Sequence, residues 1–134
     1  MKRVFADAVY FLALVNPRDE LHASAVGLSH HPPGSIVSTE RVLTEVADAL
    51  CSPAKKMRFI RLLHLLQSQR DVEIIPASSS LFERGCSLYE SRADKEWSLT
   101  DCISFLVMSD LGLIEALTAD HHFEQAGFTA LMRA

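Results

Sequence analysis

The sequence predicts an α/β protein: a three-layer α/β/α sandwich around a central, mainly parallel sheet of about four to five strands. Short apolar runs alternate along the chain with longer segments of helical periodicity, and strands separated by helices pair in parallel. The chain has 134 residues, a length that supports one complete hydrophobic core. We therefore expect a single domain over residues 1–134.

The composition is that of an ordinary folded protein. Hydrophobic residues make up 49% of the chain and charged residues 22%, so intrinsic disorder is not expected. The formal net charge of -4 argues against a protein that coats nucleic acid by bulk positive charge. A local basic patch remains compatible with this value.

Neither a membrane span nor a signal peptide is expected. No segment reaches the roughly 18 to 20 uninterrupted apolar residues of a spanning helix. The first residues, MKRVFADAVYFLALVNP, superficially resemble a signal peptide, but Asp7 interrupts the apolar run and Asn16-Pro17 stands where small residues should mark a cleavage site. We therefore expect residues 3–14 to be part of the fold and the protein to be cytoplasmic.

The predicted strands are short apolar runs bounded by acids, prolines or loops. The first ends at Asp7, the second follows the loop sequence HHPPG, and the third stops at Pro76. The strands are predicted at residues 3–7, 36–38, 72–75, 115–119 and 128–131.

The predicted helices have apolar residues at helical spacing and recognisable ends. Asn16-Pro17 ends the first, Ser38 or Thr39 caps the third, a Ser cap precedes the fifth, and Gly112 ends the sixth. The helices are predicted at residues 8–14, 19–29, 39–50, 53–69, 78–92, 100–111 and 121–125.

Four acids follow or open these elements at places where a parallel sheet builds its ligand site. Asp7 and Asp120 come at the ends of the first and fourth strands, Asp101 opens the sixth helix, and Glu45 lies one turn into the third. Ligands of open parallel sheets bind beyond the carboxyl ends of the strands, near the point where strand order reverses. These four carboxylates are therefore candidates for one shared acidic site.

Three of the acids also have an ordinary structural interpretation. Asp7 and Asp120 are both placed to cap the helices that follow them. Glu45 is compatible with a solvated helix position, and Glu40 and Asp48 compete with it for a functional role. The four acids taken together favour the shared site, because a carboxylate in apolar surroundings is costly unless it has a partner.

The fourth acid, Asp101, stands in WSLTDCISFLVM, a segment that is otherwise almost entirely apolar. One interpretation is local: Ser98 caps the helix and Asp101 completes a variant capping box, facing the positive end of the helix dipole. The other is that Asp101 forms one wall of a metal site. Both remain open at the level of the sequence.

Four motifs in order along the chain resemble those of the PIN domain, in particular of VapC-like ribonucleases from prokaryotic toxin-antitoxin systems. The resemblance covers essentially the whole chain, and the joint order of the motifs is what makes it specific. They read VFADAVYFLALVNPRDELH, VLTEVADAL, DKEWSLTDCISFLVM and EALTADHHFEQAGF.

The resemblance implies a PIN-like fold and four family acids at Asp7, Glu45, Asp101 and Asp120, listed here in chain order. Thr118 takes the place of the hydroxyl residue often found two positions before the last acid. It also implies a toxin that cuts RNA, a small antitoxin as partner and a homodimer. The family commonly has Thr or Ser directly after the first acid, where this chain has Ala8, so a supporting hydrogen bond is absent.

Carboxylates without a Cys or His framework suit a hard divalent cation, Mg²⁺ or Mn²⁺. Such an ion activates water and offsets charge on phosphate, so hydrolysis of RNA phosphodiester bonds fits the site. We assign Asp7, Asp101 and Asp120 to direct or water-mediated metal contact, and Glu45 to holding metal or activating water.

Other residues have a weaker claim to function. His121 and His122 suggest a transition-metal site beside Asp120, but consecutive side chains are expected to diverge and zinc needs more ligands. His121 is retained as a candidate RNA contact. Arg58 and Arg61 are further candidates on a helix face that is equally compatible with simple solvation.

Two functions of other classes compete with the nuclease. A catalytically weak PIN scaffold that binds RNA or protein is favoured by Ala8 and opposed by the retention of all four acids. A phosphoacceptor receiver domain also uses acids and Mg²⁺ at strand ends. It should have paired acids after its first strand, and Asp7 has no acidic neighbour.

Overall fold

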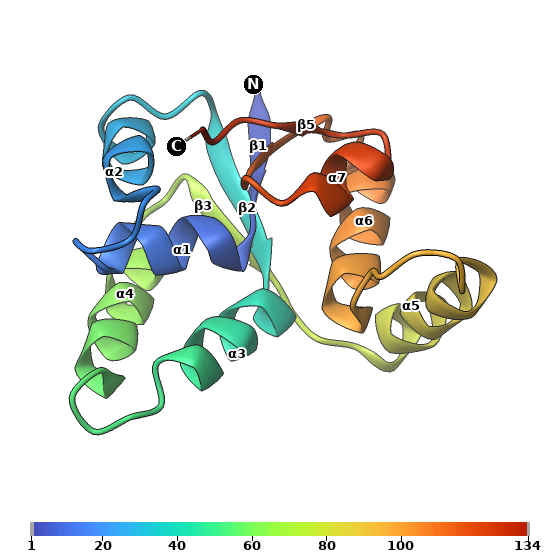
Figure 1. Ribbon diagram of the computed structural model, residues 1–134, viewed down its shortest axis with the longest axis horizontal. Helices are drawn as coiled ribbons and strands as arrows, with labels where there is room; N and C mark the ends of the chain where they lie inside the picture. Colours follow the sequence, from blue (N-terminus) through green and yellow to red (C-terminus); the bar gives the residue numbers. More distant parts are fainter. Residues whose placement is uncertain (1, 134) are drawn as a thin grey trace.

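The computed structural model describes residues 2–133 and contains one five-stranded sheet, flanked by helices on both faces (Figure 1). Every strand pairing is parallel, and the spatial order is β3-β2-β1-β4-β5. The strands are β1 (Arg3–Ala6), β2 (Ser35–Thr39), β3 (Val72–Ile75), β4 (Glu115–Leu117) and β5 (Thr129–Ala130). The predicted three-layer α/β/α sandwich is confirmed.

The helices divide between the two faces of the sheet. The first four gather on one side, and the last three, which contact one another in chain order, lie on the other (Figure 1). They are α1 (Ala8–Val15), α2 (His22–His30), α3 (Glu40–Ala49), α4 (Lys56–Ser68), α5 (Ser79–Ser91), α6 (Leu99–Leu111) and α7 (His121–Gln125). Within residues 2–133, no helix has the length and apolar character needed to span a bilayer.

Two helices begin three residues later than their sequence pattern indicates. Asp19 does not start α2, because its side chain accepts the Leu21 N–H at 2.8 Å and holds a turn instead. Ser52 similarly accepts backbone bonds from Lys55 and Lys56 in a turn that precedes α4. In both places a local polar bond competes with helix extension.

The core lies on both faces of β1, whose Val4, Phe5 and Ala6 have no exposed surface. An aromatic cluster fills the layer between the sheet and the last helices: Phe105 packs edge-on against Phe123 and Trp97, with ring centroids 5.0 Å apart in each pair. Trp97 is thus a core residue, and its indole N–H donates to Gln125 at 3.0 Å. This packing fixes the start of α6 relative to α7.

The order of the strands places a switch point between β1 and β4. The chain moves outward from β1 through β2 to β3, then crosses back to add β4 and β5 on the other side of β1. Crevices at such points, beyond the carboxyl ends of the strands, are where open α/β sheets bind ligands. Asp7 follows β1, and Thr118 and Asp120 follow β4, at this point.

Candidate active site

Asp7 is buried at the carboxyl end of β1, with 4% of its surface exposed. It occupies the N-cap position of α1, but its side chain makes no capping hydrogen bond. Instead its Oδ2 accepts a hydrogen bond from the Thr118 hydroxyl at 2.9 Å. The interpretation of Asp7 as a simple helix cap is therefore wrong, since the carboxylate points across the sheet toward β4.

Thr118 connects the first acid to the last. Its fully buried hydroxyl donates to Asp7 and accepts the backbone N–H of Asp120 at 3.1 Å. The Thr118 N–H bonds to Ala116 in a turn that ends β4 two residues earlier than predicted. One side chain therefore ties together the ends of two neighbouring strands at the switch point.

Asp101 caps α6 and also faces the other acids. Its backbone N–H donates to Ser98 Oγ at 3.0 Å and its Oδ2 accepts from the Ser98 N–H at 3.3 Å, which completes the predicted capping box. The same Oδ2 lies 3.5 Å from His122 Nδ1, on the side of Asp120. The capping bonds therefore hold the Asp101 carboxylate within the acidic group, and a metal-binding role stays a prediction.

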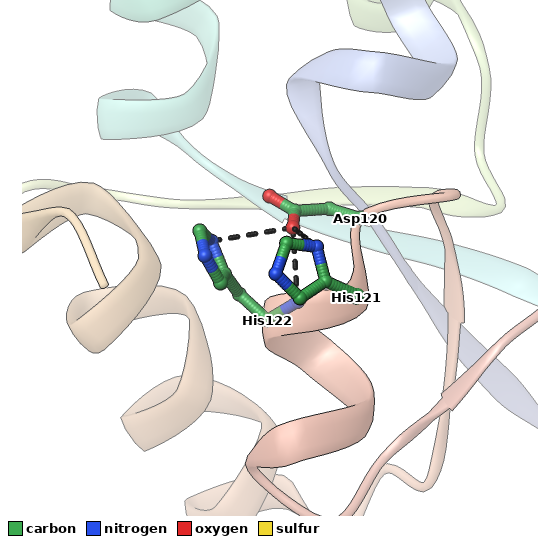
Figure 2. Close-up of side chains that lie close together, drawn as sticks. All are labelled: Asp120, His121 and His122. Atoms are coloured by element: carbon green, nitrogen blue, oxygen red, sulfur yellow. Dashed lines mark hydrogen bonds and ion pairs between the residues drawn. The ribbon is translucent and has the colours of Figure 1, made fainter. Parts of the chain in front are cut away.

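Asp120 caps α7 and gathers two histidines around one oxygen (Figure 2). Its Oδ1 accepts the His122 backbone N–H at 2.9 Å and lies 3.2 Å from His122 Nδ1 and 3.7 Å from His121 Nδ1. The expectation that consecutive histidines diverge is wrong here: their ring centroids are 4.3 Å apart. At the first turn of the helix both rings fold back toward the capping carboxylate.

The sequence suggested His122 only as part of a weaker transition-metal site, and in the structure it lies between two of the four acids. Its Nδ1 is 3.2 Å from Asp120 and 3.5 Å from Asp101, and its side chain is 18% exposed. The sequence feature that could have identified His122 is its position two residues after a capping Asp. At that position the side chain is directed back toward the cap.

Glu45 approaches the other acids from α3. Its side chain is solvent-exposed, yet its pKa is raised because neighbouring protein removes part of its hydration and because Asp101 and Asp120 repel its charge. Glu45 is therefore within electrostatic range of Asp101 and Asp120. The four predicted acids come from four separate segments, and the charge of each one interacts with at least two of the others.

Burial and mutual repulsion raise the pKa values of the two most enclosed acids. Burial raises the pKa of Asp7 to about 7, with smaller contributions from the charges of Asp101 and Glu45, against the hydrogen bond from Thr118. Burial also raises the pKa of Asp101, and Asp120 adds to the effect, while Ser98 and His122 oppose it. The protein alone therefore does not balance the charge of this group.

A divalent cation fits this arrangement. Among residues 2–133, no Lys or Arg forms an ion pair with Asp7, Glu45, Asp101 or Asp120; the nitrogen groups beside these acids belong to His121 and His122. Carboxylate oxygens without a Lys or Arg partner are ligands that Mg²⁺ and Mn²⁺ take in proteins. The acids therefore fit a divalent cation, and which metal binds stays a prediction.

The family model of the PIN domain matches residues 4–129 of this chain. The chain belongs to the PIN domain family. Among curated protein sequences, none matches this chain.

Solved structures share the PIN fold over nearly the whole chain. VapC20 from Mycobacterium tuberculosis, described as a toxin that cleaves the sarcin-ricin loop, has a TM-score of 0.87 at 23% identity, covering 97% of this chain and 99% of that one. FitAcB from Neisseria gonorrhoeae has a TM-score of 0.65 at 12% identity, covering 97% and 96%.

The basic residues proposed as RNA contacts lie away from the acids of this PIN domain. Arg58 and Arg61 flank a cavity with Leu14 and Val15, at the end of α1 opposite to Asp7. Eight helical residues span about 12 Å. These two arginines are therefore separated from the acidic group by the length of a helix.

Arg41 is a nearer basic residue that the sequence did not single out. It precedes Glu45 by one turn, so the two side chains share a face of α3. Its guanidinium lies over the ring of Phe82, 5.7 Å from the centroid. The sequence feature that could have identified Arg41 is its position four residues before Glu45 in the same predicted helix.

Proposed function

We propose that this PIN domain is a metal-dependent endoribonuclease that acts in the cytoplasm as the toxin of a toxin-antitoxin pair. Asp7, Asp101 and Asp120 hold Mg²⁺ or Mn²⁺ directly or through water, and Glu45 completes the site. The observation that carries the proposal is the convergence of four carboxylates at the switch point without a Lys or Arg partner in residues 2–133.

Residues of this chain orient the acids of the site and provide a general base. When bound, such an ion provides Lewis-acid activation of water and offsets charge at the scissile phosphate. Thr118 holds the Asp7 carboxylate and Ser98 holds that of Asp101, so neither acid must reorganise on binding. Glu45 is exposed, and partial burial together with the charges of Asp101 and Asp120 raises its pKa, which suits a general base that takes a proton from the attacking water.

RNA is the substrate that the family and the structural likeness support. VapC20 is described as a toxin that cleaves the sarcin-ricin loop, and it shares the fold over 97% of this chain. In this chain His121 is exposed beside Asp120, and Arg41 is exposed on α3 one turn before Glu45, so both are candidates to contact phosphate oxygens. Arg58 and Arg61 contact the RNA backbone only if the bound RNA extends past α1.

The homodimer and the antitoxin are supported by apolar surface that the isolated chain leaves exposed. Large apolar side chains with more than a third of their surface exposed are Met57, Ile60, Leu65, Phe82, Tyr89 and Ile114. Light scattering coupled to gel filtration tests the dimer: a mass of twice 14.9 kDa supports it and a single mass contradicts it.

The nuclease is tested by incubating a mixed, structured RNA pool with purified protein and Mn²⁺ or Mg²⁺. Parallel reactions contain EDTA, Asp101→Asn, or the control Asp48→Asn, which removes an exposed acid on α3 outside the group. We expect cutting only with metal, abolished in Asp101→Asn and retained in Asp48→Asn. Equal cutting by wild type and Asp101→Asn would show contaminating nuclease and defeat the proposal.

A scaffold that binds RNA without cutting it is the second candidate, favoured by Ala8. This buried residue, 2% exposed, puts no hydroxyl beside Asp7. RNA retention without cleavage, at metal concentrations that measurably stabilise the protein, supports the scaffold. Metal-dependent cleavage contradicts it.

A further inference from the structure

Nitrogen donors stand beside two of the acids at the start of α7. His122 Nδ1 lies 3.2 Å from Asp120 Oδ1 and 3.5 Å from Asp101 Oδ2, and His121 Nδ1 lies 3.7 Å from Asp120 Oδ1. Ligand atoms from Asp120, His121 and His122 all lie within 4.8 Å of one another. Figure 2 shows both rings turned toward the carboxylate.

These spacings are close to those of a tetrahedral zinc site. Bonds of about 2.0 to 2.2 Å at tetrahedral angles separate the ligand atoms by about 3.3 to 3.6 Å. Two imidazoles and the Asp120 carboxylate give three protein donors, which leaves the fourth position to water. Imidazole also favours Zn²⁺ over Mg²⁺. His121 is 72% exposed on its side chain, so an ion reaches the site from solvent and the ring is free to adjust.

We propose that Asp120, His121 and His122 form a zinc site at the edge of the acidic group, with the fourth position of the ion open to water. Because Zn²⁺ takes Asp120, it competes with the Mg²⁺ or Mn²⁺ that the acids bind. This competition, and the inhibition of RNA cleavage that follows from it, rest on the proposed function. The zinc site itself rests on the three donors.

The alternative is that the histidines are only ion-pair partners of the acids. In that case His122 supplies positive charge to Asp101 and Asp120 and His121 is a surface residue without a role. The two arrangements differ in what a metal does: an all-oxygen site gives six-coordinate geometry, whereas two imidazoles favour four. Co²⁺ distinguishes them, because its visible absorption is intense when tetrahedral and weak when octahedral.

The first experiment adds Co²⁺ to metal-free protein and records the visible spectrum, then displaces the ion with Zn²⁺. We expect an intense tetrahedral band in wild type, lost when Zn²⁺ is added. His121→Gln tests the exposed ligand without disturbing the core, and His122→Gln tests the second. Each should weaken Zn²⁺ binding by about tenfold or more.

The matched control replaces the other consecutive pair, His30→Gln with His31→Gln. Both of these residues are exposed at the end of α2, and the described residues place no carboxylate against them. The control should keep the tetrahedral band and its wild-type affinity. A weak, octahedral-type spectrum in wild type, or a band unchanged in both His121→Gln and His122→Gln, would overturn the site.

Competition is measured on Mn²⁺ rather than on RNA. The paramagnetic resonance signal of free Mn²⁺ falls when the ion binds, and we expect stoichiometric Zn²⁺ to restore it in wild type but not in His121→Gln. Simultaneous binding of both ions would overturn the competition. Absence of RNA cleavage would count against the nuclease alone, because neither readout depends on activity.

Discussion

The Thr118 hydroxyl donates to Asp7 Oδ2 over 2.9 Å, joining two residues that lie 111 positions apart in the sequence. Thr118 also accepts the N–H of Asp120, so one buried hydroxyl aligns two of the four acids. Because a buried carboxylate without a donor is costly, this bond matters for folding and also for the proposed metal site.

Thr118→Val keeps the shape of the side chain and removes the hydroxyl. We expect a loss of about 1 to 3 kcal/mol in the free energy of unfolding, since Asp7 and the Asp120 N–H both lose a partner. Affinity for Mn²⁺ should fall by about 10- to 100-fold. Denaturant unfolding and Mn²⁺ titration measure the two effects. Thr129→Val, at an exposed position in β5, should change neither; equal effects in both variants would contradict the role of Thr118.

Without metal, the stability of the fold should decrease as pH rises from about 4 to about 7 because of Asp7. Its pKa is 3.8 in the unfolded reference and about 7 in the folded protein. Between these values the folded state holds a proton that the unfolded state has lost, so raising the pH favours unfolding. The full effect is at most about 4 kcal/mol, reached above pH 7.

Denaturant unfolding in EDTA across this pH range, on wild type and Asp7→Asn, isolates that contribution. The variant should be the more stable protein at pH 8 and should lose part of the pH dependence. The remaining pH dependence comes from Asp101 and Glu45, whose pKa values are also raised. Parallel pH profiles for the two proteins would refute the assignment.

Added Mg²⁺ or Mn²⁺ should stabilise the wild type by about 2.7 kcal/mol at a concentration one hundred times the dissociation constant. Asp101→Asn should abolish this gain and leave the metal-free protein as stable as wild type or more so, because repulsion with Asp120 is relieved. The Asn carbonyl still accepts from Ser98. Thermal unfolding with and without metal measures both effects, and Asp48→Asn should behave as wild type.

Ser98→Ala separates helix capping from metal binding. Ser98 accepts the Asp101 N–H at 3.0 Å, and Ser78 accepts the Leu81 N–H at 3.1 Å at the start of α5. Each alanine variant should lose about 0.5 to 2 kcal/mol of stability. Only Ser98→Ala should also weaken Mn²⁺ binding, because it releases the backbone that positions Asp101. If Ser78→Ala weakens binding equally, the capping box has no part in orienting the acid.

The sequence alone determined the class of fold, and it singled out the four acids as candidates for a shared site. Alternation of apolar runs and helical segments is a local pattern, so parallel pairing and the position of Asp7 and Asp120 beyond strand ends were predictable. The capping pair of Ser98 and Asp101 was predictable for the same reason, since its bonds span three residues.

Only the tertiary structure decided how the side chains meet. The bond from Thr118 to Asp7, the placing of His122 between Asp101 and Asp120, and the approach of Glu45 all join segments far apart in the chain. The raised pKa of Asp7 likewise depends on burial between layers. Such contacts follow from the packing of helices on the sheet, which no local pattern specifies.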